Sequence, residues 1–155
     1  MAATIRCRKA PMTQVHEMMT RDVRTVAPGD SIVQAAKIMQ ELEVGVLPVC
    51  DGNKLVGVVT DRDIAVRGVA RQISPGKSSV KQIMTEDACW CYADDSIDEA
   101  LSLMSTAQIR RLPVVDRDKR LVGILSLGDL AVKGEPEATG RPLGRISEPA
   151  QPRRS

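Results

Sequence analysis

Two short motifs place a hydroxyl side chain and a carboxylate three residues apart. Thr60 and Asp63 lie in Gly-Val-Val-Thr-Asp-Arg-Asp, and Ser126 and Asp129 lie in Gly-Ile-Leu-Ser-Leu-Gly-Asp. Each pair follows an apolar run and precedes a predicted helix, so both side chains are expected near the free N–H groups of its first turn. Such a pair can cap the helix. Alternatively, the hydroxyl receives a phosphate and the carboxylate accepts hydrogen bonds from two ribose hydroxyls; the two interpretations are compatible.

The two motifs belong to an internal repeat. When Val15 is aligned with Val80, the sequence matches itself in order along a whole unit, with one inserted residue after Asp116. The matched segments are Met19-Thr20 with Met84-Thr85, Asp30-Ser31-Ile32 with Asp95-Ser96-Ile97, Leu47-Pro48-Val49 with Leu112-Pro113-Val114, and Leu55-Val56-Gly57 with Leu121-Val122-Gly123. A duplication therefore organises the chain.

Each repeat is predicted to be a β-α-β-β-α unit. A short extended segment leads to a helix that begins with a Ser-x-x-Gln/Glu capping box, and a hairpin and a final short helix follow. The predicted elements are extended segments at 23–26 and 88–92, helices from Ser31 and Ser96, strands at 46–50, 55–59, 112–115 and 121–125, and final helices from Thr60 or Ser126 to near Gly68 or Gly134.

The repeat also predicts the domain organisation. Two repeats, 15–68 and 80–134, are joined by a polar linker at 69–79. An extension at 1–14 precedes them, and a proline-rich tail at 135–155 is expected to be disordered or loosely docked. With no Phe, one Trp and one Tyr, the core is expected to be aliphatic.

The composition argues against several functions. The 22 Lys and Arg nearly balance the 20 Asp and Glu, so no overall field attracts nucleic acid or an anionic membrane. The sequence lacks a long apolar run and a signal peptide, which predicts a cytoplasmic protein. Four cysteines without CxxC spacing predict reduced thiols and no metal site. One histidine, no nucleophile elbow and no Walker loop argue against an enzyme.

The doubled motif set resembles the CBS domain, which occurs in tandem as a Bateman module. The resemblance covers about residues 15–134 and includes the Met-Thr opening, the Asp-Ser-Ile helix start, the Leu-Pro-Val strand and the final G-h-h-[ST]-x-x-D motif. It implies an α/β fold of two β-α-β-β-α repeats related by a pseudo-twofold axis, with small sheets packed with helices. In that family two clefts between the repeats can bind AMP, ADP, ATP, or sometimes NAD or S-adenosylmethionine, and modules commonly form disk-shaped homodimers.

Carried over residue by residue, the resemblance implies two clefts, which we name after their hydroxyl residues. The Ser126 cleft is predicted to contain Ser126, Asp129, Arg110 and Arg111, closed by Thr20, Arg24, Thr25, Val44 and Gly45. The Thr60 cleft is predicted to contain Thr60, Asp63, Gly45 and Val46, closed by Thr85, Cys89, Trp90, Ile109 and Arg110.

The two clefts are not expected to be equal, because Arg110-Arg111 in the second repeat replaces Gly45-Val46 in the first. Arginine binds phosphate bidentately, whereas Gly and Val carry no charge. The Ser126 cleft is therefore the predicted phosphate site, with Arg62 as partial compensation in the other cleft. Alternatively, the two arginines lie at an exposed helix end and bind nothing. Trp90 either stacks on an adenine or fills the core.

The resulting functional hypothesis is a regulatory sensor. An adenine nucleotide (AMP, ADP or ATP) binds between the repeats, alters their packing and thereby modulates a separate, unknown effector protein. The alternative is a structural dimerisation module whose motifs only cap helices.

Overall fold

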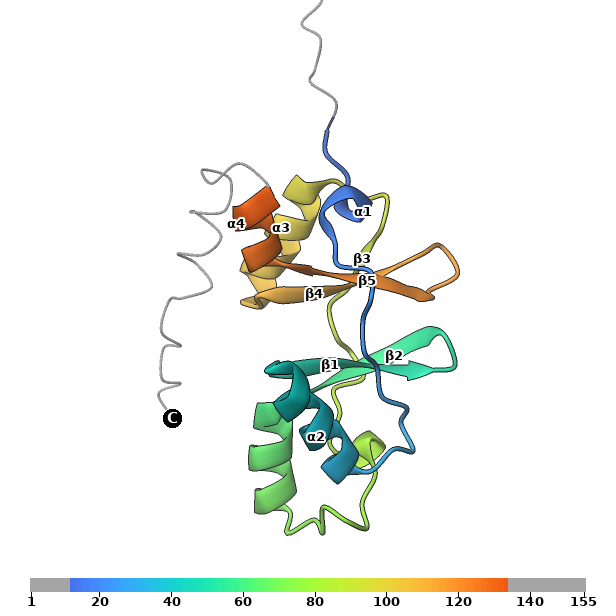
Figure 1. The fold of residues 1–155 in the computed structure, drawn as a ribbon, viewed down its shortest axis with the longest axis vertical. Coiled ribbons are helices and arrows are strands. Elements are labelled where there is room, and N and C mark those ends of the chain that lie inside the picture. The colour runs from blue at the N-terminus through green and yellow to red at the C-terminus, as the bar shows by residue number, and fades with distance from the viewer. Residues whose placement is uncertain (1–11, 134–155) are drawn as a thin grey trace, which may run out of the picture.

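The computed structural model describes residues 12–133 and confirms the predicted α/β class (Figure 1). Two small sheets face each other through their hairpins, and the helices lie beside them. Repeat 1 consists of α2 (Ile32–Leu42), β1 (Val46–Asp51), β2 (Lys54–Thr60) and η1 (Asp63–Gly68). Repeat 2 consists of β3 (Cys91–Tyr92), α3 (Ile97–Ala107), β4 (Arg111–Val115), β5 (Leu121–Ser126) and α4 (Leu127–Lys133). The helical turns α1 (Val15–Met18) and η2 (Val80–Gln82) are the first elements of repeat 1 and repeat 2 in sequence.

Both long helices begin where their capping residues predict. The Ser31 hydroxyl accepts a hydrogen bond from the backbone N–H of Gln34 at 3.1 Å. In the second repeat the box is reciprocal: Ser96 accepts from the Glu99 N–H at 3.2 Å, and the Glu99 carboxylate accepts from the Ser96 N–H at 3.0 Å. The sequence signals for these helix starts are confirmed.

The final helix of repeat 1 is longer than predicted. Helical structure spans 61–70, with the π-helical η1 in its middle, and so continues past Gly68. The reason is that the backbone remains right-handed helical at Val69, and the left-handed residue that follows the helix is Gln72, with φ of 54°. The predicted stop at Gly134 lies outside the described residues.

The predicted extended segments are strands only in small part. Val26 is the single residue of 23–26 that pairs, in a parallel bridge with Val49, and β3 retains only two residues of 88–92. The remainder of each segment is not available for pairing with its own repeat, because it crosses the molecule from one repeat to the other (Figure 1).

This crossing exchanges the first helical turns between the repeats. Val15 and Met19, from the start of repeat 1, are buried in the core of repeat 2. Val80 and Ile83, from the start of repeat 2, are buried in the core of repeat 1. Each repeat therefore has a complete core only in the presence of the other.

Matched hydrogen bonds show that the exchange obeys a pseudo-twofold symmetry. The Val15 N–H donates to the Asp95 carbonyl at 2.9 Å, and the Val80 N–H donates to the Asp30 carbonyl at 2.8 Å. These four residues occupy matched positions of the repeat. The predicted pseudo-twofold arrangement is therefore present in the backbone.

Thr20 and Thr85 pair with the other repeat where the chain crosses. Thr20 exchanges two backbone hydrogen bonds with Ile124, at 2.8 and 2.9 Å. Thr85 exchanges two with Val58, at 2.8 and 3.0 Å. The crossing backbone comes so close that a Cβ atom on Gly123 would lie 2.8 Å from the Thr20 carbonyl oxygen. A Cβ on Gly57 would overlap the Thr85 carbonyl in the same way, so the glycine that opens each motif makes room for the crossing.

The hairpins of the two repeats also meet at the pseudo-twofold axis. The Leu55 N–H donates to the Lys119 carbonyl at 3.1 Å, and the Leu121 N–H donates to the Asn53 carbonyl at 2.9 Å. Cys50, Leu55 and Val115 form a small buried cluster beside this contact. The described core contains no buried aromatic side chain, as the composition predicts.

We expect Gly57→Ala to lower the free energy of unfolding by about 2 kcal/mol, because the added Cβ must displace the Thr85 backbone. Urea denaturation followed by circular dichroism measures the change. Gly76→Ala is the matched control, because a Cβ there would meet nothing within 4 Å. Equal stability of the two variants would show that the crossing has room to move.

Candidate functional site

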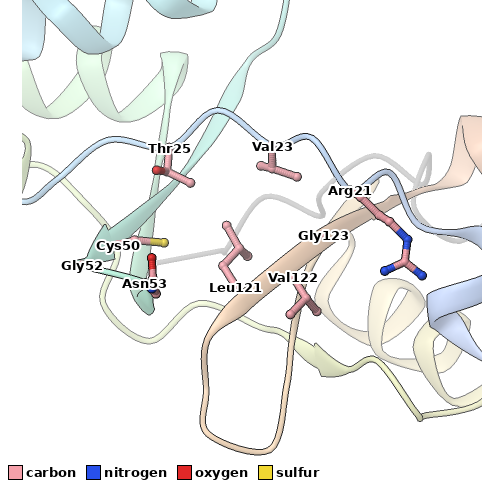
Figure 2. Close-up of a pocket in the computed structure, with 9 residues that line it drawn as sticks. All are labelled: Arg21, Val23, Thr25, Cys50, Gly52, Asn53, Leu121, Val122 and Gly123. Carbon is pink, nitrogen blue, oxygen red and sulfur yellow. The ribbon is translucent and has the colours of Figure 1, made fainter.

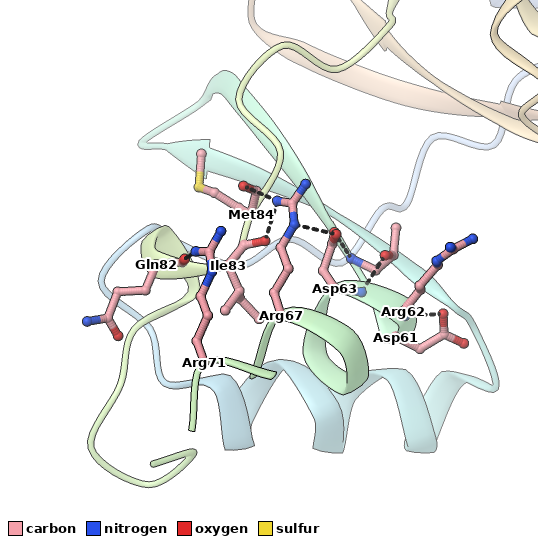
Figure 3. Close-up of polar contacts among 9 residues, drawn as sticks. Asp61, Arg62, Asp63, Arg67, Arg71, Gln82, Ile83 and Met84 are labelled. Atoms are coloured by element: carbon pink, nitrogen blue, oxygen red, sulfur yellow. Dashed lines mark hydrogen bonds and ion pairs between the residues drawn. The ribbon is translucent and has the colours of Figure 1, made fainter. Parts of the chain in front are cut away.

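The Thr60–Asp63 motif forms a reciprocal helix cap. The Asp63 N–H donates to the Thr60 hydroxyl at 3.0 Å, and the Thr60 N–H donates to the Asp63 carboxylate at 3.0 Å (Figure 3). The other carboxylate oxygen faces Arg67 Nε at 3.6 Å in an ion pair. Both oxygens of Asp63 are therefore engaged within the protein, and the capping interpretation holds for this motif.

Arg67 ties this cap to the segment that enters repeat 2. Its guanidinium donates to the carbonyls of Ile83 at 2.9 Å and Met84 at 3.1 Å, directly before the crossing residue Thr85 (Figure 3). Asp63 therefore belongs to a structural network that connects the helix after β2 to the crossing chain.

The Ser126–Asp129 motif differs in what its carboxylate does. The Asp129 N–H donates to the Ser126 hydroxyl at 3.0 Å, as in the first motif. Its carboxylate instead accepts from the Thr20 hydroxyl of the other repeat at 3.3 Å, and residues 12–133 provide no other hydrogen bond or ion pair to it. The position that matches Arg67 is Lys133, which forms no ion pair with Asp129 in the described chain. Most of the acceptor capacity of Asp129 is free.

The Ser126 cleft is a cavity of about 250 Å³ between the repeats. Six of its nine predicted residues line it: Thr20, Arg24, Val44, Arg111, Ser126 and Asp129. Three predicted residues are not in its lining: Arg110, Thr25 and Gly45. The hydroxyl, the free carboxylate and one arginine of the prediction are thus brought together.

The Thr60 cleft is larger, at about 800 Å³. It is lined by seven of its nine predicted residues: Gly45, Val46, Thr60, Thr85, Cys89, Ile109 and Arg110. Asp63 and Trp90 are absent from its lining. Asp63 is absent because its carboxylate is held by the cap and by Arg67.

The two arginines predicted for the Ser126 cleft differ in where the structure places them. Arg110 lines the Thr60 cleft only, whereas Arg111 lines both clefts. Arg110 precedes β4 and Arg111 is its first residue, and the structure places the Arg111 side chain where the two clefts adjoin. Of the two arginines predicted for the Ser126 cleft, the structure therefore places Arg111 in its lining and Arg110 outside it.

Trp90 and Thr25 occupy matched positions outside the clefts. The Trp90 ring packs edge-on against Tyr92, with ring centroids 5.0 Å apart, and lies beside the hairpin cluster. This contact favours the packing interpretation of Trp90 over adenine stacking. Thr25 instead lines a depression of about 190 Å³ with Cys50 and Asn53, beneath the crossing chain (Figure 2).

Three matched positions contribute to the difference in cleft size. At each position the Ser126 cleft carries the larger side chain and the Thr60 cleft the smaller one. The matched pairs are Leu42 and Ala107, Val23 and Ala88, and Arg24 and Cys89. The fold is duplicated, and substitutions within it set the volume of each cleft.

The prediction missed an acidic residue in each cleft. Asp22 lines the Ser126 cleft and Asp87 lines the Thr60 cleft. The sequence carried a signal for them, because each follows a matched threonine in a Thr-x-Asp triplet, at Thr20 and Thr85. Asp61 adds a further carboxylate to the Thr60 cleft.

The cysteines have different environments. Burial raises the pKa of the Cys91 thiol to about 12, with a further contribution from the negative charge of Asp95. Burial also raises the pKa of Cys50, whereas Cys89 is exposed in the wall of the Thr60 cleft. Within 12–133, three or more His, Cys, Asp or Glu side chains are nowhere grouped as metal ligands would be.

Together, the fold and the site define a duplicated module with two clefts, each lined by residues of both repeats. The CBS domain family profile matches residues 15–68 and 80–133. The chain belongs to the CBS domain family, as a tandem pair.

Relatives with known sequence or structure share this arrangement. The CBS domain-containing protein YhcV of Bacillus subtilis is 42% identical, over 88% of this chain and 96% of YhcV. A crystal structure of CBSX2 in complex with AMP is 32% identical, with a TM-score of 0.68 over 77% of this chain and 94% of that one. The CBS domain pair of MJ0100, in complex with 5-methylthioadenosine and S-adenosyl-L-methionine, is also 32% identical, with a TM-score of 0.68 over 79% of this chain and 96% of that one.

We expect Asp63→Ala to lower the free energy of unfolding by about 1 kcal/mol or more, because it removes a cap and an ion-paired carboxylate. Asp129→Ala should lower the free energy of unfolding by a smaller amount. Arg67→Met should likewise destabilise the chain, whereas Lys133→Met should not. Urea denaturation of the four variants tests this, and equal costs at the two aspartates would contradict the difference between the motifs.

Proposed function

We propose that this chain is a regulatory module that binds an adenine nucleotide between its repeats and modulates a separate effector protein. The observation that carries the proposal is the carboxylate of Asp129, to which residues 12–133 offer only the Thr20 hydroxyl, in one cleft with the Ser126 hydroxyl and the Arg111 guanidinium. A carboxylate with free acceptors suits the vicinal hydroxyls of a ribose, and a guanidinium suits a phosphate.

The ligands of the related structures support the same chemical class. AMP, 5-methylthioadenosine and S-adenosylmethionine have an adenosine group in common, and only AMP carries a phosphate. All three ligands therefore require a site for adenine and ribose. Only AMP additionally requires a cation that binds its phosphate. Asp129 supplies the ribose acceptor, and Arg111 supplies the cation.

The two clefts differ in how readily they admit such a ligand. The Thr60 cleft, at about 800 Å³, lies within the usual range of about 300–1,000 Å³ for small-molecule sites. The Ser126 cleft lies just below it, at about 250 Å³. Ligand entry there requires rotation of the exposed Leu42 and Arg24 side chains, which fill the room that Ala107 and Cys89 leave in the other cleft.

Regulation follows from the position of Asp129 between the repeats. Its bond to Thr20 is a direct side-chain link from one repeat to the other, and a ribose that binds the carboxylate competes with it. Because Thr20 lies in the crossing segment, the ligand acts on the packing of both repeats. It shifts that packing only by the difference in its affinity for the two arrangements.

We also propose that the chain forms a homodimer through its helices. Val66 and Val132, at matched positions of the two repeats, are 55% and 86% exposed, and Val69 is 75% exposed. The helices that carry them lie on the same side of the two hairpins (Figure 1). A second copy, approaching along the pseudo-twofold axis, would cover both valine positions at once. If pairing were the sole function, the module would be structural.

None of the helices within 12–133 is both long enough and apolar enough to span a membrane.

We expect Asp129→Ala to weaken AMP binding about tenfold or more, because a charged hydrogen-bond acceptor for the ribose is lost. Asp63→Ala should weaken it less, because Asp63 lines neither cleft. Isothermal titration calorimetry with AMP, ADP, ATP, NAD and S-adenosylmethionine measures both effects. An equal or larger loss at Asp63 would contradict the site assignment, and no binding of any compound at millimolar concentration would favour the structural module.

We expect Val132→Asp, alone or with Val66→Asp, to convert the homodimer to a monomer without loss of helical content, because a buried charge opposes pairing. Light scattering coupled to size-exclusion chromatography gives the mass. Thr25→Asp, at an exposed position of the crossing chain itself, is the control and should remain dimeric. A monomeric wild-type chain at high concentration would contradict the proposed interface.

A further inference from the structure

Arg111 lies where the two clefts adjoin. Its side chain lines both of them, and so do Val46, Pro48 and Ile124, which form the shared wall. Arg111 is exposed, and within 12–133 no hydrogen bond or ion pair engages its guanidinium. Its charge can therefore be directed toward a ligand in either cleft.

The repeat explains why only one cation occupies this junction. The position that matches Arg111 in repeat 1 is Val46, which lines both clefts as well but carries no charge. The other arginines are not shared: Arg24 lines only the Ser126 cleft, and Arg110 lines only the Thr60 cleft. Arg111 is thus the single guanidinium in the described chain that both clefts can use.

We infer that Arg111 couples the two clefts, so that a phosphate-bearing ligand in one cleft weakens the binding of a second such ligand in the other. This inference rests on the proposed function. A guanidinium binds one phosphate bidentately through its fork of N–H groups, so two phosphates compete for it. The phosphates also repel each other, because both are anionic and occupy adjoining cavities.

The coupling should depend on phosphate. Adenosine presents the same adenine and ribose without a negative charge, so its binding in the two clefts does not involve Arg111. By linkage, the weakening is reciprocal: each cleft lowers the AMP affinity of the other by the same factor. The module then responds to a phosphorylated nucleotide over a wider concentration range than one site allows.

The test is calorimetric titration of the full chain and of two single-cleft variants with AMP and with adenosine. Asp129→Ala disables the Ser126 cleft, and Cys89→Trp fills the Thr60 cleft, with Ala88→Trp as an alternative filler. We expect the cleft that fills second in the wild type to bind AMP at least about fivefold more tightly when the other is disabled. Adenosine should show no such gain.

Two substitutions taken from the matched repeat separate coupling from simple loss of affinity. Arg111→Val, which copies Val46, should reduce the gain for AMP in the single-cleft variants to the part that repulsion between the two phosphates causes. Arg110→Gly, which copies Gly45, should weaken AMP in the Thr60 cleft and leave the gain intact, because Arg110 lines one cleft only.

The outcomes separate this inference from the proposed function. If the wild-type chain binds one AMP molecule but two adenosine molecules, the coupling is strong enough to prevent the second AMP from binding. This result would support the inference. Two AMP molecules bound with the same affinities in the wild type and in the single-cleft variants would overturn the coupling and leave the proposed function intact. One AMP and one adenosine per chain would also overturn it. No binding of either compound would overturn both.

Discussion

The structure depends on one close approach of backbone to backbone, repeated twice. Thr20 lies against Ile124 and Thr85 against Val58, each through two hydrogen bonds. The approach is possible only because Gly123 and Gly57 carry no Cβ. It delivers the first helical turn of each repeat into the core of the other, and it brings a crossing segment along the wall of each cleft. Neither cleft exists within a single repeat.

Duplication of the fold leaves each copy free to diverge in chemistry. Asp63 and Asp129 occupy the same place on the same scaffold, yet one is held by Arg67 and the other has Lys133 at that position. An ion-paired carboxylate with both oxygens engaged stabilises the helix it caps, whereas a free one can accept bonds from a ligand. One difference along a helix, Arg67 against Lys133, therefore accompanies an ion-paired carboxylate in one motif and an unpaired one in the other within residues 12–133.

Much of this architecture could be predicted from local sequence. Hairpins and helix starts follow from turn residues and capping boxes, such as Gly52 with φ of 61° and Ser96 with Glu99, which act over a few positions. The exchange of first helical turns could not be predicted in this way, because Val15 and Val80 have the same apolar character whichever repeat receives them. The clefts that Arg110 and Arg111 line could not be predicted for a similar reason, because the motif gives their positions in the chain and not the directions of their side chains.

The magnitude of one hydrogen bond limits what a ligand can do here. A net contribution of about 1 kcal/mol for the Thr20–Asp129 bond corresponds to a factor of about 5 between two arrangements of the repeats. A ribose that replaces Thr20 on this carboxylate thus makes a modest switch by itself.

Thr20, however, directly follows Met19, which is buried in the core of repeat 2, and Thr85 directly follows Met84, which is buried in the core of repeat 1. Displacement of a crossing segment therefore disturbs core packing as well as one polar bond, and packing changes in a close-packed core cost more than a single hydrogen bond. In the proposed regulation, the larger part of the free energy would therefore come from this packing, and the carboxylate would be the point where the ligand acts on it.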